Sequence, residues 1–197
     1  MNLNRLILYL ALCLFLTHCK SPSDQIKDAF KTVDESLEKS NNVLSNSVEG
    51  LYSAIKSNRQ KNESLALRAD SIYFATNDAN KFIDSLKQTM QLQDTSGMNL
   101  NLATTLLVFT NTGDSLAKML LNVYANASSY PLANSKKQML DSALQSIQEI
   151  QHDQQWTKKY FKATPTVAAI TILTKFQNDC TNAATITLAD IKQRLTD

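Results

Sequence analysis

The sequence predicts an all-α fold, an elongated up-and-down helical bundle with three long and about two shorter helices. The 197 residues include only 3 Gly and 3 Pro, which are too few for the many tight turns of a β-rich fold. Apolar residues recur at steps of three and four along most of the chain, and this is the spacing of one helix face. A chain of this length that is 43% hydrophobic can form a core of its own, so residues 20–197 are predicted to be a single domain.

Residues 1–19 precede this domain and have a different composition. After Arg5, an apolar run covers residues 6–16. At about 1.5 Å per residue, the run is shorter than the ~30 Å core of a bilayer, so it predicts a secretory signal rather than a membrane-spanning helix. The signal ends in the letters LTHC, which resemble a bacterial lipobox. That resemblance implies that Cys19 receives a lipid; an ordinary cleaved signal and an uncleaved anchor are the alternatives.

The remaining cysteines and the charges limit the other functions. Cys13 lies inside the signal, so Cys180 is the only cysteine left after Cys19, and no intramolecular disulfide is expected. Cys180 is predicted to be a small apolar residue on a helix, with an intermolecular bridge as the alternative. Twenty basic residues face 18 acidic ones, and no basic cluster is interleaved with aromatic residues. Nucleic acid is therefore not expected as a partner.

The first two long helices are predicted from two apolar stripes. The first helix should begin at Ser23, with Ser23 or Asp24 as its N-cap, and should run for about 35 residues. Its stripe has one polar interruption at Ser40 and Asn41 and contains Ile26, Phe30, Val33, Leu37, Leu44, Val48, Leu51 and Ile55. The second stripe contains Leu65, Ala69, Ile72, Thr76, Ala79, Ile83, Leu86 and Met90. It should end before residues 94–97, DTSG, which are a turn signal.

Two shorter helices are predicted in the middle of the chain. Residues 98–113 fit either a short helix or an extended segment packed on the bundle. Asp114 is then expected to cap a helix that carries Leu116, Leu120, Val123 and Tyr124. After a loop around Tyr130 and Pro131, another helix should run from about Asn134 to Gln154, with Leu140, Leu144 and Ile147 facing inward.

The last long helix is predicted where strand-forming residues are abundant. Thr164 suits an N-cap, and Pro165 suits the first helical position, which needs no amide hydrogen. A spacing of three and four then continues through Val167, Ile170, Leu173, Gln177, Ala184, Leu188, Ile191 and Leu195. β-Branching costs only a few tenths of a kcal/mol per residue in a helix. We therefore expect a helix of about 30 residues that runs antiparallel to the first two.

The residue types that catalysis requires are scarce, so the sequence predicts no enzyme, no cofactor and no metal site. His18 lies in the signal, and His152 with Cys180 cannot provide a zinc set, a Cys–His dyad or a Ser-His-Asp triad. The acidic pair Asp34-Glu35 is interpreted as a solvated helix face. Trp156, Tyr160 and Phe161 are interpreted as a plug at one end of the core, with a ligand platform or docking surface as the alternative.

Two segments carry a family resemblance. Residues 29–41, AFKTVDESLEKSN, and residues 164–179, TPTVAAITILTKFQND, resemble the first and last long helices of one domain. It is the amino-terminal periplasmic helical domain of the GldM/PorM-type proteins of Bacteroidota. The resemblance implies dimeric inner-membrane proteins of the gliding-motility and type IX secretion machinery. In such proteins a transmembrane motor helix precedes this domain and β-domains follow it.

This chain differs on both sides of that domain, because a lipoprotein-type signal precedes it and the sequence ends at Asp197. We therefore expect a non-catalytic, lipid-anchored periplasmic scaffold or accessory protein. Its expected partners are secretion or motility envelope proteins or full-length family relatives, and a homodimer through a helix stripe is an alternative. Lys20 favours the outer membrane over the inner one. The alternative function is a small-molecule-binding or sensor bundle with its ligand beside Trp156.

Overall fold

The computed structural model describes residues 21–93, 102–152 and 166–197, and these residues confirm the predicted all-α bundle. The three long helices are α2 (Pro22–Ser57), α3 (Glu63–Gln93) and α7 (Thr166–Thr196). The other two helices of the described residues are α4 (Leu102–Ser128) and α5 (Asn134–His152). A short 3₁₀ helix, η1 (Arg59–Lys61), joins α2 to α3.

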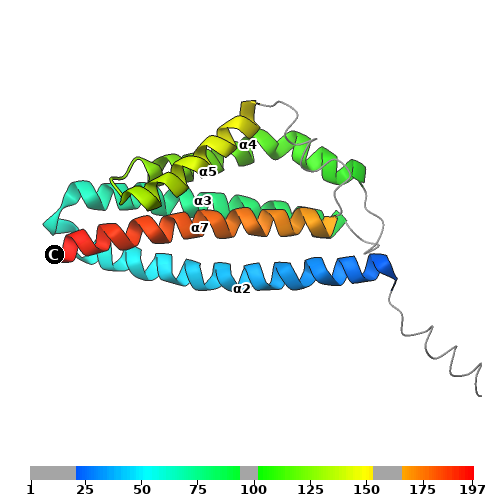
Figure 1. The fold of residues 1–197 in the computed structure, drawn as a ribbon, viewed down its shortest axis with the longest axis horizontal. Coiled ribbons are helices and arrows are strands. Elements are labelled where there is room, and N and C mark those ends of the chain that lie inside the picture. The colour runs from blue at the N-terminus through cyan, green and yellow to red at the C-terminus, as the bar shows by residue number, and fades with distance from the viewer. Residues whose placement is uncertain (1–20, 94–101, 153–165) are drawn as a thin grey trace, which may run out of the picture.

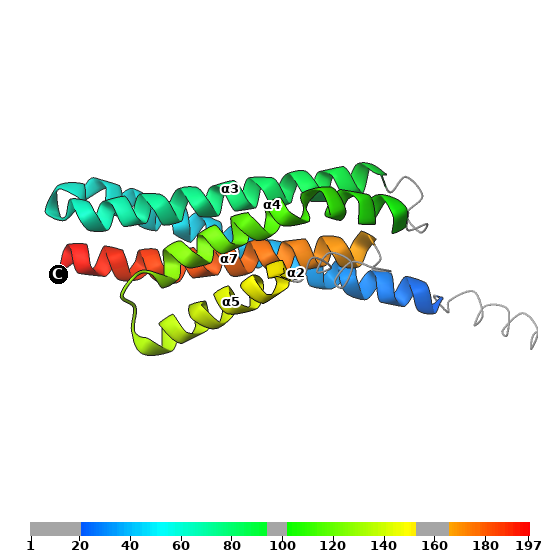
Figure 2. The same ribbon diagram turned by 90° about the horizontal axis from the view of Figure 1, so that it is seen from above.

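The long helices lie side by side along the longest axis of the molecule, as Figure 1 shows. Helix α4 returns over α3 and α7, and α5 packs on α4 alongside the bundle, where the view from above places it to one side (Figure 2). The last helix was expected to run antiparallel to both of the first two long helices, and this prediction was right for one of them and wrong for the other. Helix α7 runs antiparallel to α3 but parallel to α2 (Figure 1). In a chain whose successive helices alternate in direction, the first and fifth helices must point the same way.

The start of α2 differs slightly from the prediction. The cap is Ser21 rather than Ser23 or Asp24, because the Ser21 hydroxyl oxygen accepts the backbone N–H of Asp24 at 3.2 Å. Pro22 then occupies the first turn, where its missing amide hydrogen costs nothing. The Ser21 hydroxyl also donates to the Asp24 carboxylate at 2.7 Å. Two contacts of the Ser21 hydroxyl with Asp24 therefore fix the point at which the helix begins.

The middle of the chain forms a longer helix than expected. Residues 102–113 and the predicted cap Asp114 all lie inside α4, so the proposed boundary at Asp114 was wrong. Gly113 does not interrupt the helix because a glycine costs only about 1 kcal/mol in a helix interior, which packing can outweigh. Helix α3 ends at Gln93, immediately before the predicted turn. Helix α5 begins at the predicted Asn134.

Helix α7 occupies the centre of the bundle and packs against α2, α3 and α4. The predicted apolar positions from residue 170 onward are buried, and so are several threonines. Thr181 and Thr187 each donate a hydroxyl hydrogen bond to the carbonyl oxygen four residues earlier, at 2.8 Å and 3.0 Å. A buried threonine can therefore fill space among α-helices without leaving its hydroxyl unsatisfied. This explains how a segment rich in β-branched residues forms the central helix.

A single core joins all five helices of the described residues. Its largest fully buried side chains are Tyr130, Ile55, Ile72, Ile83, Leu116, Leu140, Leu173, Leu188, Ile191 and Val123. At one end, the Arg194 guanidinium of α7 donates to the Pro131 carbonyl oxygen at 2.8 Å and lies 5.4 Å from the centre of the Tyr130 ring. These contacts attach the connection between α4 and α5 to the end of α7.

Candidate functional site

The four site residues predicted from the sequence lie outside the described residues. Cys19 belongs to residues 1–20, and Trp156, Tyr160 and Phe161 belong to residues 153–165. The lipid attachment and the aromatic plug or docking surface therefore stay predictions. A candidate site has to be sought among the side chains of the described helices.

Reactive groups are sparse in the part of the chain that the structure describes. Those residues contain no group of three or more His, Cys, Asp or Glu side chains placed to hold a metal ion. Cys180 is a free, fully buried thiol on α7, in agreement with its interpretation as a small apolar residue. Burial, followed by the charge of Asp179, raises the pKa of this thiol far above its usual range. A thiol kept neutral and out of water is a poor nucleophile.

The buried thiol predicts a loss of stability at alkaline pH. Because the pKa of Cys180 is raised in the folded state, its contribution is complete below the unfolded pKa of about 8.5 and is lost as the pH rises above that value. Between about pH 7 and pH 10, the wild type should lose about 2 kcal/mol more unfolding free energy than Cys180→Ala. Urea denaturation of both proteins at the two pH values measures this difference. Equal losses would show that the thiol ionises as freely in the folded protein as in the unfolded chain.

The acidic pair Asp34-Glu35 is only partly a solvated face. Glu35 is exposed and lies 3.8 Å from Lys31, one turn away on the same helix. The Asp34 carboxylate instead accepts a hydrogen bond from the buried Thr174 hydroxyl of α7, at 2.6 Å. The interpretation was therefore right for Glu35 and wrong for Asp34, which links the two parallel helices.

An apolar stripe on the first half of α2 is left largely uncovered. It consists of Ile26, Phe30, Val33 and Leu37, which we call the α2 stripe. Ile26 is 56% exposed and Val33 is 49% exposed, while Phe30 and Leu37 are half-buried. The same periodicity continues into Val48 and Ile55, which are buried. Only the second half of the predicted stripe is therefore part of the intramolecular core.

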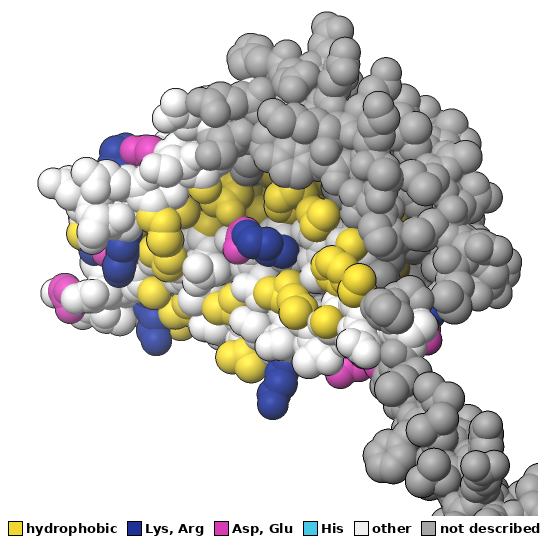
Figure 3. All heavy atoms as spheres, turned by 45° about the vertical axis from the view of Figure 1, so that its right-hand side comes forward, with side chains coloured by type: hydrophobic (Ala, Val, Ile, Leu, Met, Phe, Trp, Pro, Cys, Tyr) yellow, Lys and Arg dark blue, Asp and Glu magenta, His cyan; other side chains and the backbone are white. Residues whose placement is uncertain are grey.

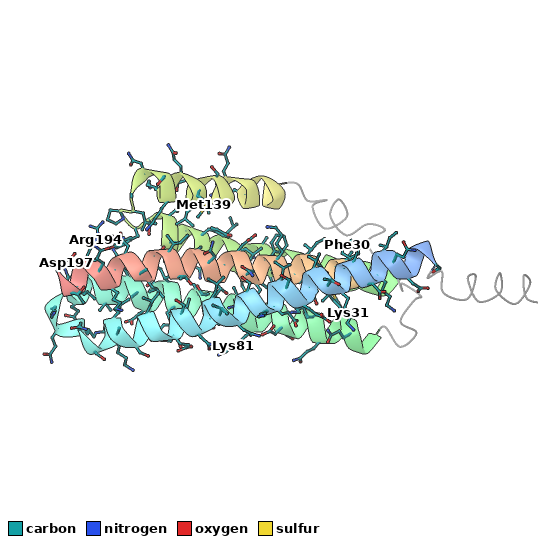
Figure 4. The ribbon with its side chains drawn as sticks, turned by 60° about the horizontal axis from the view of Figure 1, so that its bottom comes forward. Phe30, Lys31, Lys81, Met139, Arg194 and Asp197 are labelled. Carbon is teal, nitrogen blue, oxygen red and sulfur yellow. The ribbon has the colours of Figure 1, made fainter. Side chains whose placement is uncertain are left out.

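Two other helices also carry apolar side chains that are only partly buried. Helix α7 contributes the half-buried Ile172 and Phe176, and α5 contributes Met139, which is 49% exposed. Figure 4 shows Phe30 on the side of α2 that faces α7, and Met139 on the side of α5 that faces α7. Figure 3 shows hydrophobic side chains gathered in a hollow on one face of the molecule. We call the α2 stripe and these side chains of α7 and α5, taken together, the α2–α7–α5 face.

A second surface feature is an aromatic cluster near the turn between α2 and α3. The rings of Tyr52 and Tyr73 are stacked with centroids 3.8 Å apart, and Phe74 meets both edge-on. The two tyrosine hydroxyls donate to Asp70 at 3.0 Å and to Glu49 at 2.7 Å. These contacts hold α2 and α3 together where they approach each other.

A polar cleft opens farther along the same two helices. Its volume is about 400 Å³. Its walls are Glu38, Asn41, Asn42 and Ser45 of α2 and Asn77, Asn80, Lys81, Asp84 and Lys87 of α3, and Gln177 of α7 also lines it. At one end, the buried Lys87 ammonium donates to the Glu38 carboxylate at 2.9 Å. Asn41 was expected only as a polar interruption of the first apolar stripe, and that interruption was the available signal for this cleft.

The comparison with known families agrees with the fold. A model described as GldM N-terminal domain matches residues 25–194. That range begins in the first turn of α2 and ends in the last turn of α7, so it spans the whole bundle. No curated protein matches the chain. Among the described residues, no helix is both long enough and apolar enough to cross a membrane.

Proposed function

Because the chain belongs to the GldM N-terminal domain family, a family of gliding-motility and type IX secretion proteins, we propose that it is a non-catalytic scaffold or accessory protein of that apparatus. It acts in the periplasm through protein–protein contacts. The observation that carries this proposal is the α2 stripe, in which Ile26 and Val33 remain largely exposed although α2 packs on α7.

The partner that fits this stripe best is a helix from another domain of the same family. Ile26 and Val33 are seven residues apart, with Phe30 and Leu37 completing steps of three and four. That spacing is the seam of a helix-on-helix contact, in which apolar side chains insert between those of the facing helix. Large exposed apolar side chains grouped on one face are typical of interaction sites rather than of free surface.

The membrane attachment in this proposal comes from Cys19. The LTHC sequence at residues 16–19 follows an apolar run too short to span a bilayer. A lipid on Cys19 would place the amino end of α2, and therefore the exposed stripe, next to the membrane. Since Lys20 follows Cys19, the outer membrane is favoured over the inner membrane.

The proposal is tested by chemical crosslinking in the native bacterium, followed by affinity purification of the wild type and of Cys19→Ala. The wild type should recover secretion or motility components, among them a GldM-type relative. Cys19→Ala should recover much less of them, because the untethered protein is no longer concentrated at the membrane. Recovery of the same partners by both forms would contradict the lipid anchor. Recovery of no envelope protein by either form would contradict the scaffold function.

A further inference from the structure

The polar cleft between α2 and α3 has a volume and a lining that two helices separated only by water do not require. Helix α2 packs mainly on α7 and makes few contacts with α3. The two helices therefore stand apart along the cleft, whose volume of about 400 Å³ is within the roughly 300 to 1,000 Å³ range of small-molecule sites.

Two buried acceptor atoms at this cleft lack hydrogen-bond donors. The side-chain oxygens Oδ1 of Asn41 and Oδ1 of Asn80 are buried and accept no hydrogen bond from the described residues. Asn41 as a whole is only 8% exposed. The Nδ2 group of Asn80 is already engaged, because it donates to the Thr181 hydroxyl at 3.1 Å. Buried acceptors without a donor are unfavourable, so a ligand that provides donors here would gain more than it would at an open surface.

The charges around the cleft indicate a ligand without net charge. Two carboxylates, Glu38 and Asp84, are balanced by two ammonium groups, Lys81 and Lys87. Lys87 is engaged by Glu38 at 2.9 Å, and the Asp84 carboxylate accepts from Gln177 Nε2, also at 2.9 Å. An anion or a cation would therefore meet no uniform attracting field in this cleft.

The remaining lining groups both donate and accept hydrogen bonds. Besides Asn41 and Asn80, the cleft presents the carboxamides of Asn42 and Asn77 and the hydroxyl of Ser45. A side-chain amide offers two donors and one acceptor oxygen side by side. Vicinal hydroxyl groups offer the complementary pattern, because each hydroxyl both donates and accepts. The lining is more polar than that of most small-molecule sites, which argues against an apolar ligand.

From these observations we propose that the α2–α3 cleft binds a neutral polyhydroxylated ligand, a mono- or disaccharide unit, through the amides of Asn41 and Asn80. This site is separate from the α2–α7–α5 face and does not depend on the scaffold function. Figure 4 shows Lys81 projecting from α3 beside α2, where it lies at the edge of this cleft.

The test uses the full-length mature protein labelled with ¹⁵N and titrated separately with glucose, N-acetylglucosamine and putrescine. A sugar should shift the side-chain amide signals of Asn41, Asn80 and Gln177 at concentrations up to about 10 mM. Asn41→Ala combined with Asn80→Ala should weaken sugar binding at least about tenfold. The control Asn122→Ala, an exposed amide on α4, should leave it unchanged.

Three results would overturn the proposal. The first is the absence of localised shifts with either sugar. The second is sugar binding that is equally strong in the double variant and in the control. The third is binding of putrescine without binding of sugars, which would assign the cleft to a cation. Because unfolding would also abolish binding, the backbone spectrum of the double variant has to match that of the wild type before its titration is compared.

Discussion

Leu188→Ala is expected to lower the free energy of unfolding by about 3 kcal/mol, which corresponds to a fall in melting temperature of roughly 9 °C. Leu188 is fully buried on α7, the helix that packs against α2, α3 and α4. Truncation removes apolar contacts and leaves a cavity that neighbouring helices cannot easily fill. Urea denaturation and a thermal scan measure the two quantities.

The matched control is Leu67→Ala on α3, which removes the same atoms from a side chain that is 51% exposed. Its effect should be below about 1 kcal/mol. If both variants lost the same stability, α7 would not be the central helix of the folded protein.

Ile26→Asp combined with Val33→Asp is expected to weaken association with the partner at least about 100-fold while leaving the bundle folded. Both side chains are largely exposed in the isolated chain, so carboxylates at these positions stay hydrated and cost little in folding. In a complex with a facing helix the carboxylates would be desolvated without a counter-charge, which is strongly unfavourable. Affinity purification from cells and the unfolding free energy of the purified variant measure the two effects.

The control for this pair is Lys31→Gln combined with Lys39→Gln. It changes the net charge by the same two units on the exposed opposite side of α2, and Figure 4 shows Lys31 on the side of the helix away from Phe30. This control should keep its partner. Loss of the partner in both double variants would mean that net charge rather than the α2 stripe controls association.

Much of the fold could be predicted because helix positions depend on local periodicity. The stripes of the second and last long helices identified residues that are buried in α3 and α7, among them Ile72, Ile83, Leu173 and Leu188. Periodicity identifies the apolar face of a helix but not what covers it. For this reason the α2 stripe could not be distinguished from core, although Ile26 and Val33 remain exposed.

The polar features were harder to predict because they depend on residues far apart in the chain. Asp34 is adjacent to Thr174 only because α2 and α7 run in parallel. The α2–α3 cleft exists because α2 packs on α7 more than on α3. Asn41 and Asn80 meet there from different helices, and nothing in either local sequence specifies that meeting.

The most direct test of the proposed docking surface is photo-crosslinking in the native bacterium from single positions on α2. A photoreactive amino acid is placed at position 33, in the exposed stripe, or at position 35, on the solvated side of the same helix turn. We predict a crosslink to a GldM-type helical domain from position 33 and none from position 35. Equal crosslinking from both positions, or crosslinking from position 35 alone, would contradict docking through the α2 stripe.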